Sequence, residues 1–411
     1  MKLQLKAPRQ ACASIALPTS KSISNRALMI AALCGNEPQV LHPALCDDTA
    51  VMVDALGSQG NDLDIDVGAA GTAMRFLTAY FATRDGVTVR LDGCSRMRER
   101  PVGVLVDALR SLGASIDYLG QEGYPPLRVT GTAMHGGDVE MEGGVSSQFI
   151  SAVMMVLPVI GGGTVRLKGD IVSMPYIRMT AAVMRDMGAV VDVSGNVISV
   201  ANGYAGNDYI VEADWSSAAP WYALAALLPA SSLRLEGLCR DSIQGDAQLV
   251  ELGARLGIAS RFDASGVVLD SSRFIDCCCS NFADMTSTPD LVPSWVVLMC
   301  LLERSFRMTG VRTLRLKESD RIEVLRQELE KLGYVLKIEG NDAILWYGER
   351  VAVGTQPPVI DPHGDHRMAM AFAPAAVRFP GLVINDADVV SKSYPAFWRH
   401  LEQAGFEVVR S

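Results

Sequence analysis

Cations and hydroxyl groups gather at residues 17–28, LPTSKSISNRAL, where a helix is expected to start. Apolar residues recur at helical spacing after Ser22, so Ser22 is predicted to cap this helix. The free N–H groups of a helix start favour an anion, and Lys21 and Arg26 add positive charge beside them. The stretch can therefore hold a phosphate or a carboxylate, and the structural alternative is a solvated basic helix start.

Three further predicted helices also carry an arginine in or just before the first turn. The segments read GTAMR up to Arg75, KESDR up to Arg321 and GDHR up to Arg367. The helix dipole disfavours a cation at this position, so each arginine alone would suggest an ion pair with a neighbouring aspartate. Four such helix starts, counting Arg26, instead indicate a cleft lined by helix N-termini that binds small polyanionic molecules.

Other polar clusters stand ahead of predicted helices, and each taken alone would be a structural feature. They are Ser146, Ser147 and Gln148 before the apolar stretch 149–157, Ser173 and Tyr176 around Pro175, Arg100 before Pro101, and Lys392 before Ser393. Three acids, Asp290, Glu318 and Asp365, lie near cations. Because nearby cations lower a carboxyl pKa and burial raises it, Asp290 and Glu318 are candidates for proton transfer. Helix capping is the alternative for Asp290.

A helix that ends in a glycine, often followed by a short alternating strand, recurs along the chain. Six glycines fit this pattern as helix C-caps, where a left-handed backbone is needed: Gly57, Gly113, Gly188, Gly257, Gly333 and Gly405. Repeats that hold both helices and strands predict an α/β or α+β fold, with two domains of three units each. We expect residues 17–234 in one domain and residues 1–16 with 235–411 in the other.

Length and composition exclude several classes of protein. The 411 residues suffice for two domains, and a net charge of −9 argues against a nucleic-acid partner. Apolar runs are too short for a membrane span or a signal peptide, which predicts a cytoplasmic protein, and we expect a monomer. The sequence has no HExxH, GxxxxGK[ST] or GxGxxG motif in the required context, so no metal or other cofactor is expected. The nine cysteines, three of them adjacent at 277–279, are interpreted as reduced structural thiols.

Nine motifs follow one another along nearly the whole chain: LPTSKSISNRAL, GAAGTAMRFL, RERPVGVLVDAL, SSQFISAVMM, SIQGD, TPDLVP, LRLKESDRIEVL, GDHRMAMAF and KSYPAFW. In content and order they resemble the 5-enolpyruvylshikimate-3-phosphate (EPSP) synthase family of enolpyruvyl transferases. The resemblance implies two domains of three βαβαββ units each. It also implies transfer of the enolpyruvyl group of phosphoenolpyruvate to the 5-hydroxyl of shikimate 3-phosphate, in aromatic amino acid biosynthesis, by an enzyme that glyphosate inhibits.

The resemblance further implies a role for each candidate residue. Shikimate 3-phosphate would be bound by Lys21, Ser22, Arg26, Ser146, Ser147, Gln148, Ser173, Asp290 and Lys317, with Tyr176 nearby. Phosphoenolpyruvate would be bound by Lys21, Gly71, Arg100, Gln148, Arg321, Arg367 and Lys392. Asp290 and Glu318 would be the acid–base pair, and Lys21 would act on both substrates. The first domain would thus bind shikimate 3-phosphate, and the second would supply the acid–base pair and further contacts to phosphoenolpyruvate.

Two alternatives remain open at this point. The sister transferase that acts on UDP-N-acetylglucosamine has a Lys-Asn pair near its N-terminus and usually a reactive loop cysteine, whereas this chain has Lys21-Ser22, and Cys94 follows a strand. A non-catalytic anion-binding module would explain the cations but not Asp290 and Glu318. One departure from the EPSP synthase pattern is Ala69, where the family usually has an asparagine near phosphoenolpyruvate.

Overall fold

The computed structural model describes residues 1–36, 38–229, 231–271 and 282–411. The chain divides into two compact units: an inserted unit, Thr19–Val211, and a terminal unit that combines Met1–Pro18 with Glu212–Ser411. The divisions expected from the sequence were 16/17 and 234/235. The second division falls earlier because strand β13 (Ser232–Glu236) pairs in parallel with β2 (Cys12–Ala16), which holds residues 232–236 in the terminal unit. The cysteines at 277–279 lie outside the described residues.

Two four-stranded sheets of the inserted unit share one order of elements, strand, helix, strand, helix and two strands. The first contains β4 (Asp62–Asp66), α3 (Gly71–Ala82), β5 (Thr88–Asp92), α5 (Gly103–Ser111), β6 (Ser115–Tyr118) and β7 (Leu127–Thr130), with α4 (Ser95–Arg98) before α5. The second contains β8 (Gly137–Glu142), α6 (Ser147–Val156), η1 (Leu157–Val159), β9 (Gly163–Lys168), α7 (Met174–Asp186), β10 (Val191–Ser194) and β11 (Val197–Val200). In each, the first two strands are parallel and the last two antiparallel.

The third part of the inserted unit is smaller. It contains α1 (Lys21–Leu33), β3 (Val40–Leu41), α2 (Asp47–Leu56) and β12 (Tyr209–Ile210). Here β12 and β3 form a two-stranded parallel sheet in the described residues.

Three four-stranded sheets of the terminal unit repeat the βαβαββ order. One contains β16 (Phe282–Asp284), α10 (Val292–Leu301), β17 (Phe306–Thr309), η4 (Arg312–Leu316), α11 (Arg321–Lys331), β18 (Lys337–Glu339) and β19 (Ala343–Trp346). In the other two the chain ends complete the order. One runs from β2 to η2 (Trp215–Ala218), α8 (Ala219–Leu227), β13, η3 (Gly245–Gln248), α9 (Leu249–Arg255), β14 (Ala259–Asp263) and β15 (Gly266–Asp270). The other runs from β20 (Val359–Ile360) to α12 (His366–Phe372), η5 (Ala373–Val377), β21 (Leu382–Ile384), η6 (Ala387–Lys392), α13 (Phe397–Gln403), β22 (Glu407–Arg410) and β1 (Leu3–Lys6).

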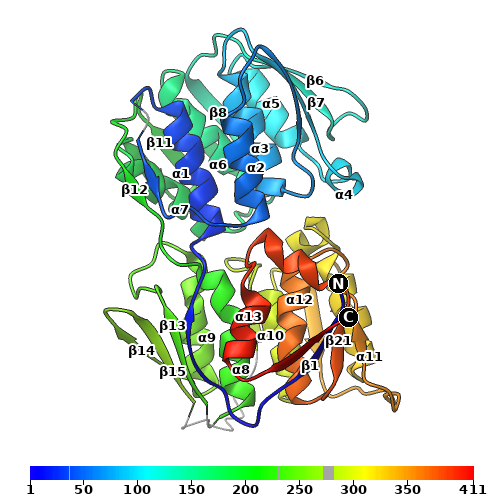
Figure 1. Ribbon diagram of the computed structural model, residues 1–411. Helices are drawn as coiled ribbons and strands as arrows, with labels where there is room; N and C mark the ends of the chain where they lie inside the picture. Colours follow the sequence, from blue (N-terminus) through cyan, green and yellow to red (C-terminus); the bar gives the residue numbers. More distant parts are fainter. Residues whose placement is uncertain (37, 230, 272–281) are drawn as a thin grey trace. The chain divides into compact units, whose positions relative to one another are not determined.

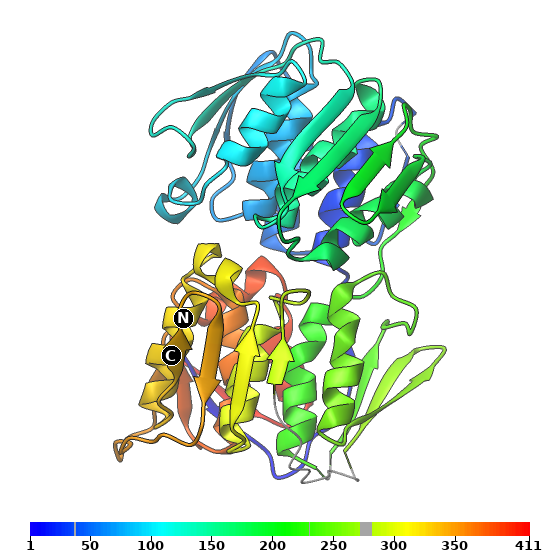
Figure 2. The same cartoon turned by 180° about the vertical axis from the view of Figure 1, so that it is seen from behind.

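Four of the inner helices are buried along their whole length. Every residue of α3, α8, α10 and α12 is buried. Helices that bury every residue are enclosed by other elements, and α8, α10 and α12 pack on one another inside the terminal unit (Figures 1 and 2). In the inserted unit α1, α3 and α6 are inner helices that contact one another, and α7 packs on α1 and α6. The predicted α/β fold is confirmed, and in the described residues five parts have the βαβαββ order while the third part of the inserted unit has a two-stranded sheet.

Five of the six predicted glycine caps are confirmed. Gly113, Gly188, Gly257, Gly333 and Gly405 follow their helices with φ between 79° and 95°. Gly57 does cap α2, but the prediction that its backbone is left-handed was wrong, because its φ is −82°. Gly60 has the positive φ instead, at 115°.

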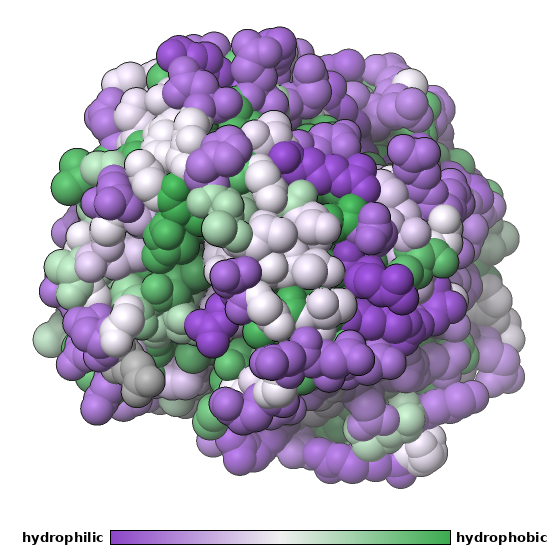
Figure 3. All heavy atoms as spheres, turned by 90° about the horizontal axis from the view of Figure 1, so that it is seen from above, coloured by the Kyte–Doolittle hydropathy of each residue, from purple (hydrophilic) through white to green (hydrophobic). Residues whose placement is uncertain are grey.

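The surface seen in Figure 3 carries mostly hydrophilic side chains, with hydrophobic residues in small groups. Among the described helices, none is both long enough and apolar enough to cross a membrane. Six described cysteines have unpaired thiols, namely Cys12, Cys34, Cys46, Cys94, Cys239 and Cys300.

Candidate active site

The first helix of the inserted unit begins one residue before the predicted cap. Ser20 is the N-cap of α1, and its hydroxyl accepts from the N–H of Ile23, so the prediction that Ser22 caps the helix was wrong. Lys21 is therefore the first helical residue. Its Nζ lies 2.9 Å from Oδ2 of Asp48 at the start of α2, and both side chains are largely buried. The ion pair places the Lys21 ammonium beside the start of two packed helices.

Arg26 is buried rather than solvated, which excludes the surface alternative for this residue. Its guanidinium donates to Oγ1 of Thr180 (2.7 Å), the carbonyl of Ser22 (2.8 Å) and Oγ of Ser151 (3.2 Å). Burial lowers the pKa of Arg26 to about 10, partly offset by Tyr176. Arg26 thus joins α1, α6 and α7 through neutral hydrogen-bond partners, and no ion pair with another described residue balances its charge.

The polar residues at the starts of α3, α6 and α7 lie on packed helices. Ser146 is the N-cap of α6, and Nε2 of Gln148 donates to Oγ1 of Thr72 in the first turn of α3 (3.0 Å). Ser173 is buried and caps α7 in the left-handed region, with φ 56°. A serine held in this conformation is uncommon, and such strain clusters at functional sites.

Gly71 begins α3 directly beneath the guanidinium of Arg100. A Cβ built on Gly71 would lie 2.5 Å from Nη1 and 2.9 Å from Cζ of Arg100. Arg75 connects the same two segments, since it donates to the carbonyls of Gly71 (3.1 Å) and Pro101 (3.3 Å). The arginine of this helix start is therefore structural, and Arg100 is the one placed over the glycine.

The terminal unit gathers four cations and three carboxylates into one network. Arg321, 1% exposed, lies at its centre and donates to three acids, Asp365 (Nε to Oδ2, 2.8 Å), Asp290 (Nη1 to Oδ1, 2.9 Å) and Glu318 (Nη2 to Oε2, 3.0 Å). Lys392 lies 3.6 Å from Oε1 of Glu318. The network has one net positive charge, because it contains four cations, Lys317, Arg321, Arg367 and Lys392, and three carboxylates, Asp290, Glu318 and Asp365.

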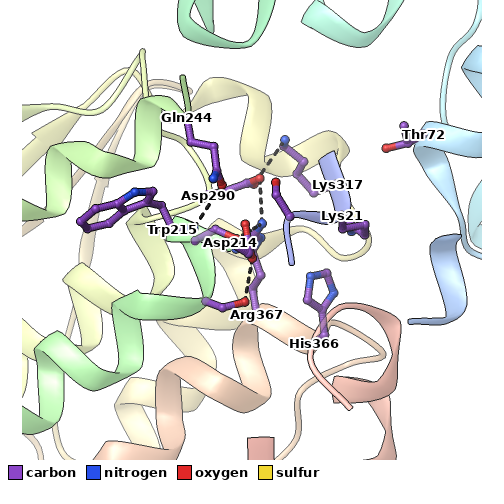
Figure 4. Close-up of polar contacts among 12 residues, drawn as sticks. Lys21, Thr72, Asp214, Trp215, Gln244, Asp290, Lys317, His366 and Arg367 are labelled. Carbon is purple, nitrogen blue, oxygen red and sulfur yellow. Dashed lines mark hydrogen bonds and ion pairs between the residues drawn. The ribbon is translucent and has the colours of Figure 1, made fainter. Parts of the chain in front are cut away.

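Asp290 forms ion pairs with three cations, and Figure 4 shows two of them, Lys317 and Arg367. Nη2 of Arg367 lies 3.0 Å from its Oδ2, and Nζ of Lys317 lies 3.5 Å from its Oδ1. Burial raises the pKa of Asp290, but Arg367, Lys317 and Arg321 outweigh burial and hold it well below the usual range. The residue before α10, Leu291, is the N-cap and has no side-chain cap bond, so helix capping by Asp290 is excluded.

Three contact residues were missed or left without a role by the sequence reasoning. Asp48 pairs with Lys21, Asp365 caps α12 and holds Arg321, and Ser216 accepts from Nη2 of Arg367 (3.2 Å). Ser216 in turn donates to Asp214 (2.6 Å), and Figure 4 shows Asp214 and Arg367 close together. Only Asp365 had a sequence signal, its place beside His366 and Arg367 at a helix start.

The candidate residues are divided between the two units. The inserted unit holds Lys21, Ser22, Arg26, Gly71, Arg100, Ser146, Ser147, Gln148 and Ser173. The terminal unit holds Asp290, Lys317, Glu318, Arg321, Arg367 and Lys392. The first group is cationic and rich in hydroxyls, whereas the second combines cations with ionisable acids.

Comparison with known proteins gives the family. The model of the EPSP synthase family (3-phosphoshikimate 1-carboxyvinyltransferase) matches residues 5–64 and 56–401. The chain belongs to the EPSP synthase family. A 3-phosphoshikimate 1-carboxyvinyltransferase of Bacteroides fragilis (strain YCH46) is 45% identical over 411 residues, 99% of each chain. That of Syntrophobacter fumaroxidans is 38% identical over 420 residues, 95% of this chain and 96% of the relative.

The EPSP synthase fold is also found by comparison with solved structures. EPSP synthase from Acinetobacter baumannii superposes with a TM-score of 0.74 at 21% identity, and the match covers 100% of both chains. At this identity the structural likeness supports the fold, and the family assignment rests on the sequence matches.

Proposed function

We propose that this chain transfers the enolpyruvyl group of phosphoenolpyruvate to the 5-hydroxyl of shikimate 3-phosphate and releases phosphate. The observation that carries the proposal is the sequence match to 3-phosphoshikimate 1-carboxyvinyltransferases along 99% of the chain. The two groups of charged residues suit two substrates that each bear a phosphate and a carboxylate. A site rich in cations offsets the mutual repulsion of such substrates and aligns them.

Shikimate 3-phosphate is assigned chiefly to the inserted unit. The residues are Lys21, Ser22, Arg26, Ser146, Ser147, Gln148 and Ser173, to which the terminal unit adds Asp290 and Lys317. Support comes from the buried, uncompensated charge of Arg26 and from the hydroxyls at the starts of α6 and α7. A charged guanidinium surrounded by neutral partners is well suited to pair with an anionic substrate group.

Phosphoenolpyruvate is assigned to residues of both units, Lys21, Gly71, Arg100, Gln148, Arg321, Arg367 and Lys392. Gly71 lets the guanidinium of Arg100 approach the start of α3. The first N–H groups of a helix have no partner within the helix and can bind phosphate. Arg321 and Arg367 carry planar guanidinium groups suited to the carboxylate. Lys21, Arg100 and Lys392 would stabilise the charge on phosphate as it leaves.

The reaction proceeds by addition and elimination. The 5-hydroxyl oxygen bonds to C2 of phosphoenolpyruvate, its proton passes to a carboxylate, and C3 gains a proton to become a methyl group. The C2–O bond to phosphate then breaks while C3 loses a proton, which restores the double bond in the product. Asp290 and Glu318 serve as the acid–base pair, and neither a metal nor a covalent enzyme intermediate is required.

Substrate binding makes Asp290 a stronger base in this proposal. The pKa of its carboxyl is depressed by Arg367, Lys317 and Arg321. Anions bound to those cations neutralise part of their charge, so the pKa of Asp290 rises when both substrates are present. Proton transfer is thereby favoured only in the loaded site.

The function is tested by measuring phosphate release with two acceptors. We expect release when phosphoenolpyruvate is mixed with shikimate 3-phosphate, and none when UDP-N-acetylglucosamine replaces it. Release with the nucleotide sugar alone would favour the sister transferase, and release with neither would favour a non-catalytic anion-binding protein. The cytoplasmic location and monomeric state expected from the sequence stay predictions.

Gly71→Ala is expected to weaken the binding of both phosphoenolpyruvate and glyphosate. The new Cβ would meet the guanidinium of Arg100 at 2.5 Å, so the flexible end of Arg100 must move away from the phosphate position. A displacement of about 1 Å can cost up to roughly a hundredfold in catalytic efficiency, so we expect the KM for phosphoenolpyruvate to rise by about tenfold or more. Steady-state kinetics with glyphosate as a competitive inhibitor measures both effects.

Gly35→Ala is the matched control, because a Cβ there meets no atom of the described residues within 4 Å. Unchanged KM and glyphosate inhibition in Gly71→Ala, or inhibition by glyphosate that is not competitive with phosphoenolpyruvate in the wild type, would contradict the assigned pocket.

A further inference from the structure

A buried carboxylate in the terminal unit has no role in the reaction as proposed. Glu328 lies on α11, seven residues after Arg321, and is 1% exposed. Its Oε2 accepts from the N–H of Asp361 (3.0 Å) and lies 2.6 Å from Nζ of Lys331, and its Oε1 lies 3.2 Å from Nε2 of His363. A buried charge is costly unless it is paired and hydrogen-bonded, so these contacts define a specific structure.

Two of the three partners of Glu328 lie in one tight turn, residues 361–365, which follows β20 directly. His363 and Gly364 are both left-handed, with φ 51° and 69°. The N–H of His363 donates to Oδ1 of Asp361 (2.8 Å), and the N–H of Asp365 donates to the carbonyl of Pro362 (3.0 Å). A left-handed histidine costs conformational energy, so the turn depends on contacts that hold it.

The 361–365 turn ends at the residue that holds Arg321. Asp365 is 0% exposed, caps α12, and accepts from both Nε and Nη2 of Arg321. The turn is therefore attached to α11 at two places about two helical turns apart, by Asp365 at Arg321 and by Asp361 and His363 at Glu328. The first attachment is part of the network around Asp290, and the second lies outside it.

We propose that Glu328, with His363, is a positioning residue for the phosphoenolpyruvate-binding arginines. It fixes the 361–365 turn on α11, which sets the place of Asp365, and Asp365 orients both Arg321 and the first turn of α12 that carries Arg367. This inference rests on the proposed function, because it takes Arg321 and Arg367 as ligands of phosphoenolpyruvate. Neither Glu328 nor His363 is among the residues assigned to a substrate.

The test compares two variants with a matched control. Glu328→Gln removes the charge at nearly constant shape. His363→Asn removes the ring contact but keeps a residue that tolerates the left-handed backbone. Glu330→Gln makes the same chemical change as Glu328→Gln two residues further along α11, at an exposed position. The KM for each substrate, kcat and the melting temperature are measured for all three, and binding of shikimate 3-phosphate alone is measured by calorimetry.

We expect the KM for phosphoenolpyruvate to rise about tenfold or more in Glu328→Gln and by a smaller factor in His363→Asn. The affinity for shikimate 3-phosphate should stay within about twofold of wild type, because its main ligands are assigned to the other unit. Glu330→Gln should match the wild type. If Glu328→Gln does not fold, His363→Asn decides the question.

Two outcomes would overturn the inference. One is a KM for phosphoenolpyruvate equal to that of Glu330→Gln in both variants, or in His363→Asn alone where Glu328→Gln does not fold. The other is an equal loss of affinity for both substrates, which would indicate a general loss of structure. Failure of the proposed function has a different signature, because the wild type itself would then release no phosphate from the two substrates.

Discussion

Lys21→Met is expected to abolish phosphate release from shikimate 3-phosphate and phosphoenolpyruvate while the protein stays folded. The Lys21 side chain is 13% exposed and lies at the start of α1, where the helix dipole adds to its charge. Methionine has a similar length but no charge, so the variant removes electrostatic stabilisation of the leaving phosphate. Loss of one such group costs about a hundredfold to a thousandfold in kcat, and a cation shared by two substrates should cost more.

Asp48 supplies the control for this prediction. Lys21→Met leaves the buried carboxylate of Asp48 without its 2.9 Å partner, which destabilises the fold for a reason unrelated to catalysis. In the double variant Lys21→Met with Asp48→Asn, the charge is removed from both sides, so the melting temperature should recover while turnover stays absent. Recovery of turnover together with stability would show that Lys21 is structural, and an unchanged kcat in Lys21→Met would refute its assignment to the site.

Arg321→Met should destabilise the terminal unit as well as abolish activity. The side chain is 1% exposed and pairs with Asp290, Glu318 and Asp365, so its removal takes the shared cation from three largely buried carboxylates. Breaking a buried pair by deleting one partner costs about 3–5 kcal/mol. Arg321→Lys keeps the charge but cannot donate to three acids in the same directions, so it should retain part of the stability and little of the activity.

Tryptophan fluorescence can follow this loss of stability in the terminal unit. All five tryptophans, Trp215, Trp221, Trp295, Trp346 and Trp398, lie in the terminal unit. A urea titration followed by this fluorescence therefore reports on the unit that contains Arg321. A midpoint for Arg321→Met equal to that of the wild type would contradict the central place of this arginine in the network.

Much of the fold was predictable because local chemistry decides it. Five glycines after helices are left-handed as predicted, since few other residues accept that backbone. The prediction for Gly57 was wrong because the turn after α2 takes its left-handed residue three positions later, at Gly60. The cap of α1 was misplaced because Ser20 and Ser22 are equally good caps by type, and only the path of the chain selects Ser20.

Site residues could be predicted where a charged residue stands at a predicted helix start. They could not be predicted where their role depends on how helices pack together. Arg321 and Arg367 were found from the arginine signal at helix starts, and both lie in the acid–cation network. Arg75 gave the same signal but is used for structure, because its guanidinium bonds to backbone carbonyls. Asp48 was missed because its role depends on the packing of α2 against α1, which no local motif encodes.

The central claim is enolpyruvyl transfer by addition and elimination, and the reaction in heavy water tests it most directly. Protonation of C3 from solvent makes a methyl group, and elimination then removes any one of its three hydrogens. We therefore expect the enolpyruvyl product of shikimate 3-phosphate to carry deuterium on its vinyl carbon, and mass spectrometry of the product measures this. Phosphate release without deuterium in the product, or without an enolpyruvyl product at all, would contradict the addition–elimination mechanism.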